Sequence, residues 1–225
     1  MPTPLRLACL DIAGTTVSDD GLVMAAFIRA LERTDIPLTS PTLEYVTATM
    51  GQSKIQVFTA ITGEVARAHH ANSAFEAAYA ELVAGGVASL IPGAFEALSE
   101  MRELGMKICL TTGFAPATRD LLVDALDLRA QVDLVISPQD TPAGRGRPAP
   151  DMILTALMLL DIDSVDHVAV AGDTASDIHA GLNSGASVVA GVLTGMHDEP
   201  TLRSAGPTHI LTSIAELPDV CRAVR

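Results

Sequence analysis

The sequence predicts an α/β protein in which helices cover both faces of a parallel sheet. Short apolar runs alternate with helical stretches along most of the chain, which is the order that βαβ units produce. The runs are nearly continuous rather than alternating, as in strands that are buried on both faces. The 225 residues, 48% of them hydrophobic, are enough for one large core or for a core with a smaller insert.

Each predicted strand is short and ends in polar or small residues, and most of the helices follow directly. We expect a Rossmann-like parallel sheet from these elements. The strands are predicted at residues 6–10, 107–111, 132–136, 167–171, 187–192 and 208–211, and the helices between them at 94–104, 115–126, 151–160 and 176–184.

Residues 21–90 break this alternation, because they contain helical stretches and no convincing strand. The helices are predicted at 22–33, 41–49, 53–61 and 64–83, with Pro41 in the first helical position after Ser40. We therefore expect an α-helical cap domain at 21–90, inserted after the first strand, and a core domain made of 1–20 and 91–225.

Composition excludes several classes of partner. The net charge of −13 argues against nucleic acid, whose phosphates require clustered Lys and Arg. The 3 cysteines have no paired spacing, which favours free thiols in a reducing compartment. A charged strand end lies near the N-terminus and no apolar run is long enough for a bilayer, so we expect a cytoplasmic protein without a leader or membrane partner.

Carboxylates follow two predicted strands at the edge where the strands end. The first strand leads into Asp11, and strand 167–171 leads into Asp173, with Asp177 four residues later. Parallel strands end at the same edge, so these acids should converge. Asp11 alone could be a metal ligand, a nucleophile or a helix cap, but clustered carboxylates repel one another and suit a hard cation such as Mg²⁺.

Hydroxyl and basic residues near the same edge are typical of a phosphate site. Thr112 and Gly113 follow strand 107–111 and precede a helix, where free amides suit an anion, although a simple helix cap is the alternative. A Pro/Gly-rich loop at 142–150 carries Arg145 and Arg147. We favour Arg147, which is stiffened by Pro148, as the phosphate partner and expect Arg145 to be solvated.

The order of these motifs resembles the haloacid dehalogenase superfamily of phosphohydrolases. The resemblance implies that Asp11 is the nucleophile that attacks phosphorus and that an aspartyl-phosphate forms. Thr112 and the Gly113 amide would hold the transferring group, and Arg147 would neutralise it. The metal Mg²⁺ would be held by the Asp11 carboxylate, the Ala13 carbonyl and Asp173, with support from Asp177.

Ala13 and Lys54 refine the resemblance. Phosphatases of this superfamily usually carry a second Asp where this chain has Ala13, and that Asp protonates the leaving alkoxide. The pattern Asp-x-Ala-Gly-Thr-Thr instead resembles the phosphonoacetaldehyde hydrolase branch, in which a cap lysine forms a Schiff base while a carbon–phosphorus bond breaks. The segment Met-Gly-Gln-Ser-Lys-Ile at 50–55 resembles the motif that carries this lysine, and the loop at 142–148 resembles that family's Pro-Ala-Gly-Arg-Pro loop with two extra residues.

Other positions depart from that branch. Val57 stands where the family has a His, Phe114 stands where it has a Tyr, and Leu22 lies in the region of its Cys. A solvated residue at a helix start is the alternative for Lys54. The histidines 69, 70 and 179 are expected to lie on the surface, since neighbouring helical positions point in different directions.

The sequence thus predicts a Mg²⁺-dependent, phosphonatase-like hydrolase acting on a small phosphonate such as phosphonoacetaldehyde. The alternative is a phosphatase of the same superfamily acting on a small phosphorylated metabolite. A catalytically silent phosphate-binding protein is a third reading. By resemblance only, the insert helices could also form a homodimer.

Overall fold

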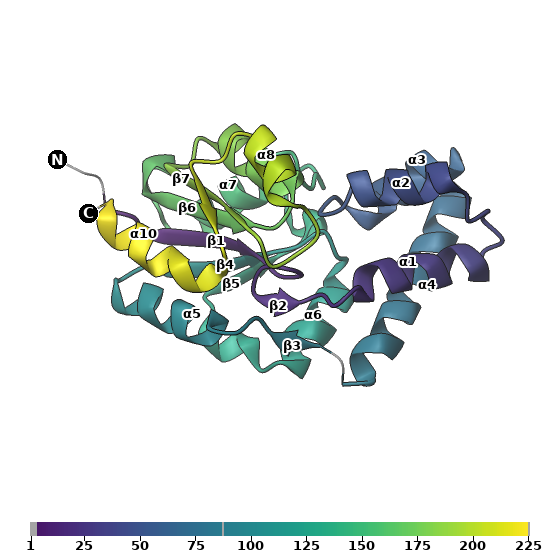
Figure 1. The fold of residues 1–225 in the computed structure, drawn as a ribbon, viewed down its shortest axis with the longest axis horizontal. Helices are drawn as coiled ribbons and strands as arrows, with labels where there is room; N and C mark the ends of the chain where they lie inside the picture. Colours follow the sequence, from purple (N-terminus) through teal and green to yellow (C-terminus); the bar gives the residue numbers. More distant parts are fainter. Residues whose placement is uncertain (1–3, 87, 225) are drawn as a thin grey trace.

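The computed structural model describes residues 4–86 and 88–224, and over these ranges it contains a 6-stranded parallel sheet (Figure 1). The strand order is β5-β4-β1-β6-β7-β8. The predicted α/β class is confirmed. The strands are β1 (Leu7–Asp11), β4 (Lys107–Thr111), β5 (Leu134–Ile136), β6 (Val168–Gly172), β7 (Val188–Val192) and β8 (His209–Leu211).

Helices cover both faces of this sheet, as Figure 1 shows. One face packs on α5 (Ala94–Glu103), α6 (Pro116–Ala125) and α10 (Leu217–Ala223), and the other on α7 (Asp151–Leu159) and α8 (Ala175–Ser184). Successive strand residues alternate between these faces. In β1, for example, Leu10 lies in the core under α5 and Cys9 in the core under α7. The short helix α9 (Glu199–Ser204) packs beside β8 and α8.

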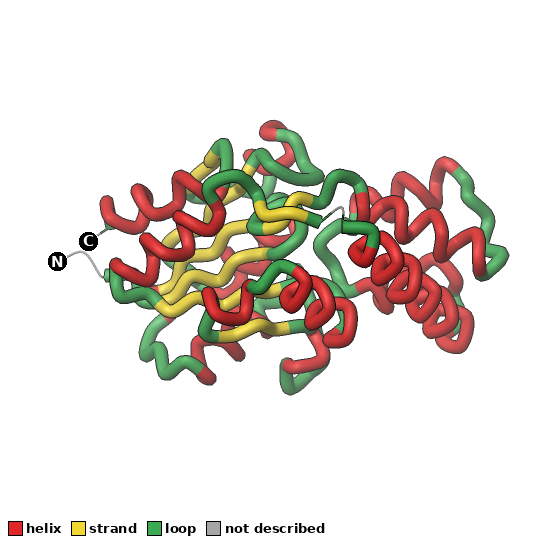
Figure 2. Tube along the Cα trace, turned by 90° about the horizontal axis from the view of Figure 1, so that it is seen from below, coloured by secondary structure: helices red, strands yellow, loops and turns green. Residues whose placement is uncertain are grey.

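The helical insert forms a separate group next to the C-terminal edge of the sheet (Figures 1 and 2). It consists of α1 (Leu22–Arg33), α2 (Ser40–Ala48), α3 (Lys54–Thr62) and α4 (Val65–Ala84), and α4 packs against both α1 and α3. The domain boundaries inferred from the sequence stay a prediction.

Two details of the insert differ from the expectation. Thr39, not Ser40, is the N-cap of α2; its side chain accepts a hydrogen bond from Thr42 N, so Pro41 is the second helical residue. The connections into and out of the insert form a short antiparallel pair, β2 (Val17–Ser18) with β3 (Ser89–Leu90), which the sequence did not reveal.

Aromatic side chains form the centre of the insert. Phe27 of α1, Phe58 of α3 and Phe75 of α4 have ring centroids 4.8–6.2 Å apart. Tyr79 of α4 continues the cluster and lies 4.7 Å from Phe114, which belongs to the loop after β4. The loop of the sheet therefore contributes a ring to the apolar core of the insert, and this contact joins the two parts.

Cys9, Cys109 and Cys221 are buried free thiols. Within residues 4–86 and 88–224, none of the helices has the length and apolar content needed to cross a bilayer.

Candidate active site

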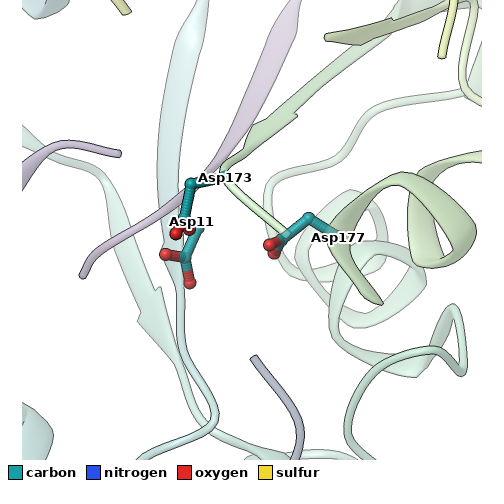
Figure 3. A group of neighbouring side chains, drawn as sticks. All are labelled: Asp11, Asp173 and Asp177. Carbon is teal, nitrogen blue, oxygen red and sulfur yellow. The ribbon is translucent and has the colours of Figure 1, made fainter. Parts of the chain in front are cut away.

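The C-terminal edge of the sheet brings the predicted acids together. Asp11 ends β1, Asp173 follows β6, and Asp177 lies in the first turn of α8 (Figure 3). One carboxylate oxygen of each lies within 4.8 Å of the others, and all three residues are buried. The chain thus gathers acids from positions 11, 173 and 177 into one cluster, as the strand ends predicted.

Arg147 is a fixed cation inside this cluster, with its side chain only 3% exposed. Its Nη1 lies 2.7 Å from Asp11 Oδ1, and its Nε lies 2.8 Å from Asp177 Oδ1. Its Nη2 donates to Thr111 Oγ1 over 2.8 Å. Arg145 lies on the surface in an ion pair with Asp151, so its predicted exposure is confirmed.

Asp177 also caps the helix on which it lies. Thr174 N donates to Asp177 Oδ2 over 3.1 Å, and the Thr174 side chain accepts from Asp177 N. One oxygen of Asp177 therefore holds the helix start while the other holds Arg147. This places Asp177 where it orients Arg147 next to Asp11.

A glycine-rich backbone encloses Asp173. Its Oδ2 accepts a hydrogen bond of 2.7 Å from Met196 N. A Cβ atom built at Gly14 would lie 2.5 Å from this oxygen, and one at Gly195 would lie 2.0 Å from it. Only glycine lets both loops approach so closely, and the φ of +85° at Gly14 also favours glycine. The role of the Gly195–Met196 loop was missed, since its sequence carries no charged motif.

The electrostatics of the cluster suit a hard cation. Burial raises the pKa of Asp11 to about 7; Asp177 adds to this and Arg147 opposes it. Burial, together with the charges of Asp11 and Asp177, also raises the pKa of Asp173. A single guanidinium faces three carboxylates here, and the donors are all oxygen, which is the chemistry that Mg²⁺ selects.

Thr112 and Gly113 lie beside Asp11 in the loop after β4. The Thr112 hydroxyl accepts from Phe114 N over 3.2 Å, so its own proton is available to a ligand. Gly113 is pressed against the insert, because a Cβ atom there would lie 2.4 Å from the carbonyl oxygen of Gln52. This loop could hold an oxyanion and also contacts the cap segment that precedes α3.

Lys54, the first residue of α3, is 6% exposed. The alternative of a solvated lysine is therefore wrong. Its Nζ lies 5.4 Å from the ring centroid of Phe114 and 5.6 Å from that of Phe27. Burial lowers the pKa of Lys54 to about 8; Asp11 opposes this shift and Arg147 adds to it. By contrast, His69, His70 and His179 are exposed as predicted.

A single pocket connects the acids with the lysine. The sequence analysis did not predict that Asp19, in the loop before α1, and Val23, in the first turn of α1, line this pocket. The residues that line it are Asp11, Ala13, Asp19, Val23, Met50, Gly51, Lys54, Thr112, Gly113, Phe114, Arg147, Asp173, Thr174 and Met196.

The fold and this pocket define a class of protein: an α/β protein with a helical insert and a buried acidic cluster at its strand ends. Residues 5–185 match the model of the haloacid dehalogenase-like hydrolases. The chain belongs to this family.

The relatives of this chain include a phosphonoacetaldehyde hydrolase and a protein named as similar to that enzyme. The chain is 32% identical over 152 residues to a phosphonoacetaldehyde hydrolase of Parabacteroides distasonis, covering 57% of this chain and 56% of that protein. It is 29% identical over 210 residues to a phosphonoacetaldehyde hydrolase-like protein of Syntrophobacter fumaroxidans, covering 85% of this chain and 74% of that one. The match with the first of these relatives thus spans about half of that relative's length.

A solved structure shares the fold. The crystal structure of a phosphonoacetaldehyde hydrolase-like protein from Oleispira antarctica aligns with a TM-score of 0.84 at 22% identity. The alignment covers 99% of this chain and 93% of that one. The arrangement of sheet and helical insert is therefore the same in the two proteins.

Proposed function

We propose that this hydrolase cleaves a small phosphonate such as phosphonoacetaldehyde in a Mg²⁺-dependent reaction through an aspartyl-phosphate. The observation that carries the proposal is the burial of Lys54 in the same pocket as Asp11. Ala13 also stands at the position where phosphatases of this superfamily usually carry their acid. The names of the relatives from P. distasonis and S. fumaroxidans support the same substrate class.

The half of the pocket that handles phosphorus belongs to the sheet. Asp11 attacks phosphorus, while the Thr112 hydroxyl and the Gly113 amide donate hydrogen bonds to the transferring group. Arg147 neutralises that group from its position 2.7 Å from Asp11. The Asp11 carboxylate, the Ala13 carbonyl and Asp173 would hold Mg²⁺, with Asp177 nearby, and the ion supplies charge neutralisation at the phosphoryl oxygens.

The half that handles the organic group belongs to the insert. The neutral amine of Lys54 attacks the aldehyde and, with loss of water and uptake of one proton, forms an iminium ion. The iminium accepts the electron pair of the breaking carbon–phosphorus bond and becomes an enamine, which a simple alkyl leaving group could not do. The rings of Phe27 and Phe114 beside Nζ exclude water and keep part of the amine neutral.

Product analysis with imine trapping tests this proposal. Phosphonoacetaldehyde and Mg²⁺ should give equal amounts of phosphate and acetaldehyde, and borohydride added during turnover should inactivate the protein and label Lys54. Lys54→Arg keeps the charge but cannot form the imine, so it should lose both turnover and label. Full turnover without a label would refute the Schiff-base step.

The alternatives predict different outcomes in the same experiment. A phosphatase would release alcohol and phosphate from small phosphate esters and leave phosphonoacetaldehyde intact. A silent phosphate-binding protein would release phosphate from neither substrate and would ignore beryllofluoride and vanadate in the presence of Mg²⁺.

A further inference from the structure

Asp19 is an acid in the pocket that neither the metal cluster nor the phosphate site uses. It lies in the loop between β2 and α1 and lines the same pocket as Lys54 and Asp11. Its Oδ1 accepts a hydrogen bond of 3.0 Å from Val23 N, and its carbonyl accepts one of 2.7 Å from Leu22 N. The start of α1 therefore fixes the carboxyl group at the wall of the pocket.

Asp19 and Lys54 line the same pocket, and each affects the pKa of the other. Burial raises the pKa of Asp19, while the amides of Val23 and Gly21 and the charge of Lys54 oppose this shift. Asp19 in turn helps to raise the pKa of Lys54 against the stronger effect of burial. Two further ionisable groups interact electrostatically with Asp19. Asp20 raises the pKa of Asp19, and the pKa of Tyr79 of α4 is itself raised by burial and by Asp19.

The carbon that leaves phosphorus needs a proton before the aldehyde can be released, because it first becomes part of an enamine, and Ala13 cannot supply that proton. Among the described residues that line the pocket, the other ionisable side chains have roles already. Asp11 and Asp173 belong to the acidic cluster, Arg147 is held between carboxylates, and Lys54 is occupied as the imine. Asp19 is the remaining carboxyl group.

We propose that Asp19 is the acid–base residue that protonates the atom displaced from phosphorus. This inference rests on the proposed function. When the carbon–phosphorus bond breaks, phosphorus is transferred to Asp11 and the electron pair forms an enamine on Lys54. The Asp19 carboxyl then gives its proton to the enamine carbon, which regenerates the iminium. Water hydrolyses the iminium to aldehyde and free Lys54, and a proton released in this step returns to the Asp19 carboxylate.

The structural role of Asp19 as a helix cap can be separated from this chemistry. Asp19→Asn keeps the Oδ1 that accepts from Val23 N but loses the ionisable proton. Asp20→Asn is the matched control, because Asp20 is the exposed neighbour and does not line the pocket. Both variants should keep the thermal midpoint of the wild type within a few degrees.

Substrates that differ in their need for a proton test the proposal. Acetyl phosphate is small and leaves as acetate without an acid, whereas ethyl phosphate and phosphonoacetaldehyde both need a proton on the departing atom. Asp19→Asn should slow kcat for the latter two by about 10²-fold or more, in line with the usual effect of a general acid. Its turnover of acetyl phosphate should stay within about threefold of the wild type, and Asp20→Asn should resemble the wild type on all three.

The outcomes that overturn the proposal are distinct. Equal slowing of all three substrates by Asp19→Asn would show that the residue only positions α1, and unchanged rates on all three would show that it has no role. If the wild type cleaves ethyl phosphate but not phosphonoacetaldehyde, the proposed function fails. The effect of Asp19→Asn on the turnover of ethyl phosphate then still tests whether Asp19 acts as the acid. A wild type inactive on all three substrates refutes both.

Discussion

The surroundings of Lys54 lower the pKa of its amine and so raise the fraction that is neutral. Its Nζ lies beside the rings of Phe27 and Phe114 and is removed from solvent, so the charged form loses hydration that its neighbours only partly replace. With a pKa of about 8, roughly a tenth of the amine is neutral at pH 7, against fewer than about one in a thousand for an ordinary lysine.

Borohydride trapping of Lys54 with phosphonoacetaldehyde should therefore depend on pH in a defined way. The amine loses its proton as pH rises, so the trapping rate should increase and level off above about pH 8. Lys107, which is exposed and paired with Asp133, is the internal control and should stay unlabelled in the peptide map. A rate that keeps rising to about pH 10 would contradict the lowered pKa of Lys54.

The sequence predicted some residues of the pocket and missed others. Asp11 and Asp173 were predictable because strand ends share one edge of a parallel sheet, whatever the helices do. Asp19 was not, since it reaches the pocket only through the path of the chain into α1. Met196 was also missed, because it acts through its backbone amide, which any residue carries.

At the scale of elements, the aromatic cluster holds the insert together. Phe75 is 1% exposed and lies within 6.2 Å, between ring centroids, of Phe27, Phe58, Tyr79 and Phe114. Helices as short as α2 and α3, with 9 residues each, have little stability alone, so the insert depends on this packing.

Phe75→Ala should lower the free energy of unfolding by about 3–5 kcal/mol, because it leaves a cavity in the cluster. Phe95→Ala is the matched control, since Phe95 is 46% exposed, and should change it by less than about 0.5 kcal/mol. Urea unfolding followed by circular dichroism measures both. Similar values for the two variants would show that the cluster does not stabilise the insert.

The contact between the β4 loop and the segment before α3 should matter for catalysis. In Gly113→Ala, the new Cβ would meet the Gln52 carbonyl oxygen at 2.4 Å and displace the chain that leads into Lys54. We expect kcat/KM for phosphonoacetaldehyde to fall by about 10²-fold while the protein stays folded. Wild-type activity in this variant would mean that the segment adjusts without moving Lys54.

Sequence patterns located the elements well where burial is periodic. The helix at 22–33 was predicted with the bounds that the structure shows, because its apolar face is regular. β2 and β3 were missed because Val17–Ser18 and Ser89–Leu90 are too short to show a period. The start of α2 was placed one residue late, since Ser is a better cap than Thr by residue type and only the geometry shows that Thr39 is the cap.

At the scale of the whole molecule, the charge distribution predicts that a bound Mg²⁺ ion would stabilise the fold. The protein has a net charge of −13, and three of its acids are buried together. A cation that binds only the folded state raises stability by mass action.

Mg²⁺ should therefore raise the thermal midpoint by several degrees at about 100 times its dissociation constant, which corresponds to about 2.7 kcal/mol. Asp173→Asn should lose most of this shift. Asp219→Asn, at an exposed acid of the last helix, should retain it. Differential scanning calorimetry in Mg²⁺ and in EDTA measures the effect, and an equal shift in both variants would argue against the proposed ligands.

The position of Phe114 has a consequence for how substrate enters. The ring is attached to the sheet, yet it is packed against Tyr79 and Phe75 of the insert. If the sheet domain and the helical insert separate, this ring is transferred into water. The free energy of that separation therefore includes a hydration cost, with a heat-capacity change and little sensitivity to salt. The rate of product release should thus follow temperature along a curved Eyring plot, and Phe114→Leu should alter that curvature.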